Sequence, residues 1–190
     1  MAEALLLRTL RLNCLTNAYA DLWSELYDDS WAQDSWAADW PGLPPLGEAG
    51  PAWGWSTPLR TERARRAALV ELDALVALML DIDAEELIAL YRSRFPQMLT
   101  YESAMWFDAD GRKIAENFNA FGHGQTKQHF EQLMAHLDPE VNGPVPDGYT
   151  APFYKADREA EYRQAHAVFS ERLRRSGWQS PAAPDADGAS

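Results

Sequence analysis

Residues 58–81 read PLRTERARRAALVELDALVALMLD, and this stretch decides the fold. Pro58 suits the first position of a helix, with Ser56 or Thr57 before it as a cap, so the stretch predicts a helix over residues 58–80. The second half of this helix is apolar on nearly every side, which is typical of a central, buried helix. The side chains expected to be buried in and after it are Leu69, Leu72, Leu75, Val76, Met79, Leu87, Leu90 and Phe95.

Further helices are predicted after this central one. Asp83 and Glu86 have the spacing of a capping box at the start of DAEELIALYRSRF, and Pro96 ends that helix. Thr126 is expected to begin another helix with the sequence KQHFEQLMAHL. A short helix over residues 97–105 and a long amphipathic helix over residues 155–175 complete this set.

The stretch WFDADGRKI, residues 106–114, predicts a β-hairpin, because Asp and Gly tolerate the positive φ that a tight turn requires. Residues 8–14 alternate between apolar and polar side chains, which favours a strand, while a helical interpretation of residues 4–12 remains open. The predicted fold class is therefore mainly α within the α+β class. A helical domain surrounds the central helix 58–80 and carries a small β-hairpin near 106–114.

We expect one structural domain with four segments. Residues 1–27 form an N-terminal strand followed by a helix over about residues 18–27, and residues 58–175 form the helical core. Between them, residues 28–57 hold five of the eight tryptophans among Pro, Gly and Ala, which predicts an irregular arm that packs through its indoles on this domain or on a partner. Residues 176–190 have little to bury and are expected to be disordered.

Composition and charge restrict the classes of function. A formal net charge of −12 argues against broad, non-specific binding of nucleic acid, which needs clustered Lys and Arg. Cys14 is the single cysteine, so an internal disulfide is excluded and a reducing, cytoplasmic location is expected. The N-terminus is acidic first and has only a short leucine run, unlike a signal peptide, and no stretch predicts a membrane span.

Tests for catalytic and metal motifs fail. In an EF-hand loop starting at Asp108 the glycine stands sixth and a glutamate twelfth, whereas here Gly111 is fourth and Asn119 twelfth. No acidic residue lies two positions before a lysine, as a common nuclease motif requires. GHG at 122–124 lacks a preceding strand, and the histidines form no HExxH. We therefore predict no catalytic, cofactor-binding or metal-binding residues, no cofactor, and no enzyme activity of this chain on its own.

Basic side chains are the remaining candidates for a site. The first turns of the central helix carry several arginines, which oppose the helix dipole and so need a compensating partner. That compensation comes either from phosphate or an acidic partner or, as we favour, from Glu62 and the acidic first 56 residues of the same chain. If Glu71 and Asp73 are buried, each needs an arginine. A second group mixes bases with aromatics in YTAPFYKADREAEYRQAHAVF, which an ordinary exposed helix also explains. The candidate contacts to the DNA backbone are Arg60, Arg63, Arg66, Lys155 and Arg158.

Several phrases occur together in this order: RLNCLTNAYADLW, RARRAALVELDALVALMLDIDAEELIALYRSRFP, MWFDADGRKIA and YTAPFYKADREAEYRQAHAVF. Together they resemble the C-terminal region of large, multidomain DNA methyltransferases of restriction–modification and phage-defence systems. The resemblance covers residues 10–175. In that family the S-adenosylmethionine site and the base-binding Asn-Pro-Pro-Tyr motif lie upstream, and this chain has neither, so no catalytic residue is carried over.

The resemblance implies a non-catalytic accessory or target-recognition-associated module. Such a module would dock on a catalytic methyltransferase or restriction domain or subunit and contact the backbone of double-stranded DNA. The alternative is an acidic protein-interaction module, such as a DNA-mimicking inhibitor or an antitoxin-like binder, which the net charge favours.

Overall fold

The computed structural model describes residues 1–40, 42–116 and 125–177 of the chain. It is mainly helical with one small antiparallel sheet, as predicted. The predicted loop at GHG 122–124 and most of the predicted tail lie outside the described residues. The α-helices are α1 Ala2–Asn13, α2 Ala20–Leu26, α3 Glu62–Met79, α4 Ala84–Arg94, α5 Pro96–Ser103, α6 Lys127–Leu137 and α7 Arg158–Arg175. The short helices η1 Asn17–Tyr19 and η2 Asp29–Gln33 and the strands β1 Met105–Phe107, β2 Lys113–Ala115 and β3 Tyr154–Lys155 complete the order.

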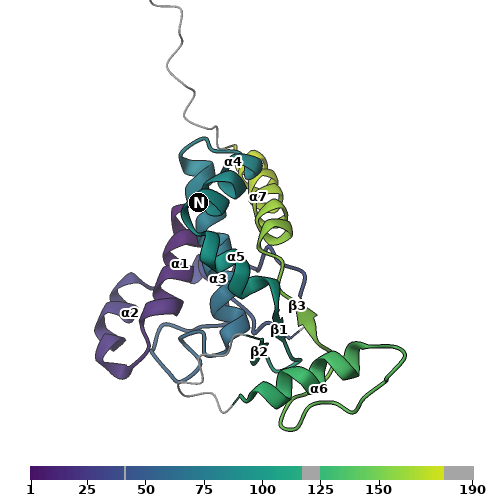
Figure 1. Ribbon diagram of the computed structural model, residues 1–190. Helices are drawn as coiled ribbons and strands as arrows, with labels where there is room; N and C mark the ends of the chain where they lie inside the picture. Colours follow the sequence, from purple (N-terminus) through teal and green to yellow (C-terminus); the bar gives the residue numbers. More distant parts are fainter. Residues whose placement is uncertain (41, 117–124, 178–190) are drawn as a thin grey trace, which may run out of the picture.

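Helix α3 is the centre of the fold, and α1 and α7 both pack against it (Figure 1). It begins at Glu62 rather than at Pro58. Thr61 is the N-cap, and its side chain accepts a hydrogen bond from the Ala64 N–H. The helix starts late because Leu59 is buried and its N–H donates to the Arg11 carbonyl at 2.8 Å, which holds the preceding segment extended.

The core is built from a different side of α3 than the sequence predicts. Of the eight side chains expected to be buried, only Leu75 is fully buried, while Leu72 and Leu87 are partly buried. The inward positions of α3 are instead occupied mostly by small residues, because α1 and α7 approach the helix closely: Ala64, Ala67, Ala68, Ala74 and Ala77. The other five predicted core residues are exposed: Leu69, Val76, Met79, Leu90 and Phe95.

The strand predicted at residues 8–14 is wrong, and the helical alternative holds. Leu7, Leu10 and Cys14 face one hydrophobic cluster at helical spacing. The alternation of apolar and polar residues is misleading here, because the polar residues Arg8 and Arg11 are themselves buried on this helix.

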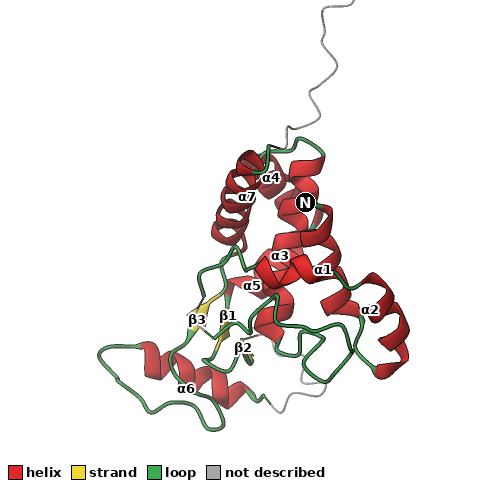
Figure 2. Ribbon diagram, turned by 180° about the vertical axis from the view of Figure 1, so that it is seen from behind, coloured by secondary structure: helices red, strands yellow, loops and turns green. Residues whose placement is uncertain are grey.

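The predicted hairpin is confirmed, with β1 and β2 antiparallel and Trp106 opposite Ile114. The third strand of the sheet is β3, which pairs with β1. Since Lys155 belongs to β3, the long helix α7 begins only at Arg158, with Asp157 as its N-cap. Figures 1 and 2 both place the hairpin and α6 at the opposite end of the molecule from α4.

The hairpin turn packs directly against the start of α3. Gly111 has φ of 77°, and a Cβ at this position would lie 2.9 Å from Thr61 Cβ. Gly148 has a similar φ of 78° but open space around it.

We expect Gly111→Ala to lower the free energy of unfolding by about 1–3 kcal/mol more than Gly148→Ala does. Both variants carry the strain of a positive φ, but only the Cβ at position 111 also crowds Thr61. Urea denaturation of Gly111→Ala beside Gly148→Ala measures this, and equal losses in the two variants would contradict it.

The tryptophan-rich segment 28–57 packs on its own chain. Trp31 is buried, Trp36, Trp40 and Trp53 are partly buried, and Trp55 is exposed. Arg11 fixes the segment to α1, since its guanidinium donates to four backbone carbonyls, those of Pro45, Leu46, Ser56 and Thr57. Burial lowers the pKa of Arg11 to about 10.

Within the described residues, no helix combines the length and the hydrophobicity needed to cross a bilayer.

Candidate functional site

The five basic residues singled out from the sequence lie in three different environments. Arg63 is fully buried, and its guanidinium lies 3.9 Å from the ring centroid of Tyr154 and 4.8 Å from that of Trp40. Burial lowers the pKa of Arg63. The aromatic rings enclose the cation in the interior, so in this fold Arg63 is not available to a phosphate.

Arg66 and Arg158 meet in a buried cluster around Glu102. Arg66 Nη2 lies 3.0 Å from Glu102 Oε2, and Arg158 Nη2 lies 2.5 Å from Glu102 Oε1. The Tyr91 hydroxyl donates to the same carboxylate at 3.1 Å. Arg66 also binds Glu161 of α7. Two bases thus neutralise two acids inside the fold, and neither arginine is free to bind DNA.

Burial and pairing act in opposite directions on the two carboxyl groups. Burial alone would raise the pKa of Glu102, but hydrogen bonds from Arg158 and the charge of Arg66 hold it below its usual value. For Glu161, burial outweighs the charge of Arg66 and raises the pKa. Burial and the charge of Glu102 raise the pKa of Tyr91 to about 12.

A surface cleft of about 360 Å³ lies beside this cluster, and Glu102, Ser103, Lys155 and Arg158 contribute to its wall. Asp157 and Glu159 also line it, so acids outnumber bases. Such a mixed wall does not form a phosphate cradle, and the Glu102 carboxylate is already bound by two guanidinium groups. We therefore assign the cluster a structural role in joining α3, α5 and α7.

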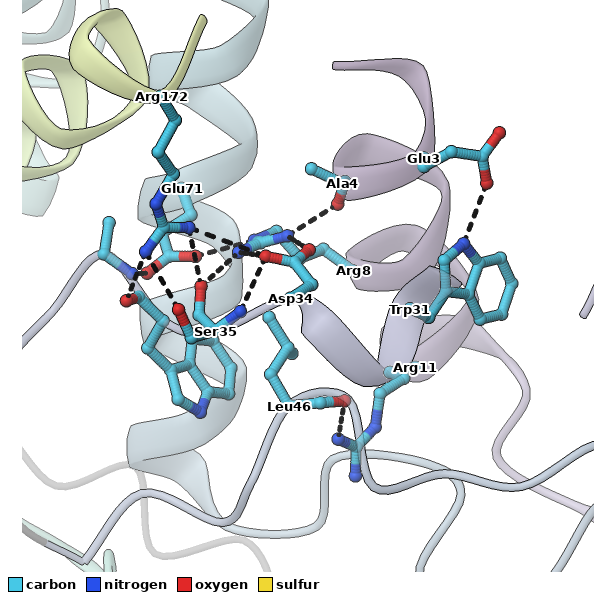
Figure 3. Close-up of polar contacts among 12 residues, drawn as sticks. Glu3, Ala4, Arg8, Arg11, Trp31, Asp34, Ser35, Leu46, Glu71 and Arg172 are labelled. Atoms are coloured by element: carbon cyan, nitrogen blue, oxygen red, sulfur yellow. Dashed lines mark hydrogen bonds and ion pairs between the residues drawn. The ribbon is translucent and has the colours of Figure 1, made fainter. Parts of the chain in front are cut away.

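A second buried network fixes α1 to α3 and explains how Glu71 is compensated (Figure 3). Arg8 Nε donates to Glu71 Oε2 at 2.6 Å, and Arg8 Nη1 donates to Asp34 Oδ2 at 2.6 Å. Glu71 Oε1 accepts the Ala37 N–H at 2.5 Å. The expected arginine partner of a buried Glu71 is thus Arg8, whereas Asp73 is exposed and accepts the Tyr162 hydroxyl at 2.7 Å.

Arg60 and Trp55 form an exposed pair, which we call the Trp55–Arg60 tip. Trp55 is 77% exposed, and the Arg60 guanidinium lies 3.9 Å from its ring centroid while Nε donates to the Trp55 carbonyl. A tight turn holds the tip, because the Thr57 N–H donates to the Gly54 carbonyl and the Gly54 N–H donates to Thr57 Oγ1. Within the described part of the chain, Arg60 makes no ion pair with a carboxylate.

Lys155 is exposed on β3, with Nζ 6.0 Å from the Trp106 ring centroid. Arg60 and Lys155 are therefore the two candidate contacts that face solvent.

The expected pairing with acids of the same chain holds for Arg66, but its partners are Glu102 and Glu161 and not Glu62 or the acidic first 56 residues. The sequence did not identify these acids, since Arg66 and Glu161 are 95 positions apart. The only signal in the sequence was that the predicted helices 97–105 and 155–175 each contain glutamate, which could pair with an arginine.

Among residues 1–40, 42–116 and 125–177, no three His, Cys, Asp or Glu side chains are placed to hold a metal ion. Cys14 is buried, and burial raises the pKa of its thiol, which disfavours the reactive thiolate. Comparison of the chain with models of protein families, with curated proteins and with solved structures finds no significant match.

Proposed function

We propose that this chain is a non-catalytic accessory module of a DNA restriction–modification methyltransferase. It docks on the catalytic part of that enzyme and contacts the DNA backbone through Arg60 and Lys155. The resemblance of four sequence phrases to the C-terminal region of such enzymes supports this assignment. The observation that carries it is the Trp55–Arg60 tip.

The tip has the properties of a binding anchor. A large indole that is exposed in a rigid turn loses little conformational entropy when a partner covers it, and Trp and Arg are enriched at the energetic centres of interfaces. The Arg60 guanidinium covers one face of the ring and has no carboxylate partner among the described residues. Trp55 thus offers an apolar anchor to the catalytic part, and Arg60 offers a positive charge beside it.

The two exposed cations set the expected dependence of DNA binding on salt. Each phosphate contact releases counterions and contributes about −0.9 to the slope of log K against log salt concentration. We expect Arg60→Ala and Lys155→Ala each to reduce the magnitude of that slope by about 0.9. The measurement is a fluorescence-anisotropy titration of a labelled DNA duplex with the full chain over a range of salt concentrations.

Arg94→Ala is the matched control, because Arg94 is also exposed and its loss changes the net charge equally. If the slope falls as much in Arg94→Ala as in Arg60→Ala, the effect is general electrostatics and Arg60 is not a contact. If neither Arg60→Ala nor Lys155→Ala alters the slope, the proposed DNA contact is wrong.

An acidic interaction module is the second candidate, and the N-terminal 56 residues favour it. Both of their basic side chains, Arg8 and Arg11, are buried. Their exposed charges are all acidic: Glu3, Asp21, Glu25, Asp28, Asp29, Asp39 and Glu48. Such a surface suits the basic face of a DNA-binding protein, and it predicts that the chain competes with DNA instead of strengthening DNA binding.

A further inference from the structure

Helix α2 presents an apolar stripe with two acids along its flank, and we call this surface the α2 face. The stripe has helical spacing at positions i, i+3 and i+7: Tyr19 is 44% exposed, Leu22 is 42% exposed and Leu26 is partly buried. Asp21 and Glu25 are exposed one helical turn apart, on the side of Leu22 away from Tyr19. Figures 1 and 2 both place α2 at the outer edge of the molecule.

The opposite side of α2 is fixed to the rest of the chain. Trp23 is fully buried, and its indole N–H donates to the Gly50 carbonyl at 2.9 Å. The Ser24 hydroxyl donates to the Pro51 carbonyl at 3.0 Å. Because these contacts already hold the backbone of α2, only exposed side chains need to be ordered when a partner covers the α2 face.

The two acids of the α2 face are not compensated by a cation. In the part of the chain that the structure describes, the carboxylates of Asp21 and Glu25 form no ion pair. The basic side chains of the first 56 residues, Arg8 and Arg11, are both buried elsewhere. Exposed apolar side chains therefore lie beside uncompensated negative charge, and charge complementarity selects a basic partner.

A second copy of the chain does not fit the same face, since a two-fold pair would set acid against acid and each copy carries −12. A basic amphipathic helix fits it. The apolar stripe of such a helix can cover Tyr19 and Leu22, while Lys or Arg side chains one turn apart meet Asp21 and Glu25.

We propose that the α2 face binds a basic amphipathic helix of a partner protein. This binding would give the acidic interaction module, the second candidate function, one surface and one class of partner. The inference rests on that candidate function and not on the methyltransferase assignment.

Isothermal titration calorimetry of the full chain with a synthetic peptide tests the α2 face. The probe is a peptide of Lys and Leu whose leucines recur at helical spacing. The comparison peptides have the same composition in shuffled order, or Glu in place of Lys. We expect the Lys–Leu helix to bind at least about tenfold more tightly than either comparison peptide. Its affinity should fall as salt rises, because salt screens the attraction between opposite charges.

Leu22→Ala is expected to weaken binding of the Lys–Leu helix about tenfold, since it removes the apolar centre of the α2 face. Val141→Ala is the matched control, because Val141 is 60% exposed on the loop after α6. It should bind the peptide like the unaltered chain.

The double variant Asp21→Asn with Glu25→Gln should bind the Lys–Leu helix more weakly and with less dependence on salt. Its matched control is Glu140→Gln with Asp147→Asn, which removes two exposed acids elsewhere on the chain. If both double variants lose the same affinity, the peptide responds to net charge and the α2 face is not its site.

Absence of binding by the Lys–Leu helix overturns the proposal, as does equal binding of the shuffled peptide or an equal loss in Leu22→Ala and Val141→Ala. Self-association of the chain that Leu22→Ala abolishes, measured by sedimentation velocity, would make a second copy the occupant and also overturn it. Circular dichroism of each variant distinguishes lost binding from lost folding. Competition of the chain with DNA is measured separately, so the α2 face can fail while the acidic interaction module stands.

Discussion

Glu71→Ala is expected to lower the free energy of unfolding by about 3–5 kcal/mol, because it leaves the buried Arg8 guanidinium without its main partner. The side chains of Arg8 and Glu71 are 0% and 1% exposed, so water cannot replace the lost contact. The Ala37 N–H loses its acceptor in the same variant. Urea denaturation followed by circular dichroism measures the change.

Glu85→Ala is the matched control, since Glu85 pairs with Arg163 on the exposed surface, where solvent screens the interaction. Its effect should be much smaller than that of Glu71→Ala. The double variant Arg8→Met with Glu71→Leu should be more stable than Glu71→Ala, because it removes the buried guanidinium together with its carboxylate partner, while Asp34 is partly exposed and keeps Arg172 at 3.5 Å. Equal losses in Glu71→Ala and Glu85→Ala would show that the α1–α3 network is not a buried ion pair.

Trp31→Ala is expected to lower the free energy of unfolding by about 3–5 kcal/mol, the usual loss when a buried tryptophan is truncated. Trp31 is 1% exposed, and its ring lies 5.6 Å from those of Trp23 and Tyr27. Its indole N–H donates to Glu3 Oε2 at 2.8 Å, which ties η2 to the first turn of α1. Thermal denaturation of the isolated chain is the measurement.

Trp55→Ala provides the contrast, because Trp55 belongs to the same segment but is exposed. Trp55→Ala should unfold at the same temperature as the unaltered chain, and it should bind the proposed methyltransferase partner more weakly. If Trp31→Ala is no less stable than Trp55→Ala, segment 28–57 does not contribute to the core of this domain. If Trp55→Ala binds the catalytic polypeptide normally, the Trp55–Arg60 tip is not the anchor.

Local sequence rules predicted the parts of the fold that local interactions determine. The capping box of Asp83 and Glu86 is present as expected, since both hydrogen bonds form within one turn of helix. The hairpin at 106–114 also follows from local chemistry. Gly111 adopts positive φ, and Asp108 accepts hydrogen bonds from the backbone and side chain of Arg112.

Contacts between distant segments determine which side of α3 is buried and which arginines are exposed, and local sequence patterns do not predict these contacts. The apolar pattern of α3 is nearly uniform around the helix, so it does not reveal which side faces α1 and α7. The core uses Ala74 and Leu75, while Leu69 and Val76 face outward.

Three of the five candidate DNA contacts, Arg63, Arg66 and Arg158, are turned into the fold for a related reason. In the sequence Arg63 and Arg66 cannot be distinguished from surface charges, because their aromatic and acidic partners lie on distant segments.

We propose that these side chains build a scaffold and a docking surface for an enzyme whose chemistry lies in another polypeptide or domain. The affinity of the proposed methyltransferase partner for duplex DNA, measured with and without this chain over a range of salt concentrations, tests this proposal. We expect tighter binding with the chain present and a slope of log K against log salt steeper by about 1.8, from the two exposed cations. Weaker DNA binding, or an unchanged slope and affinity, would contradict it.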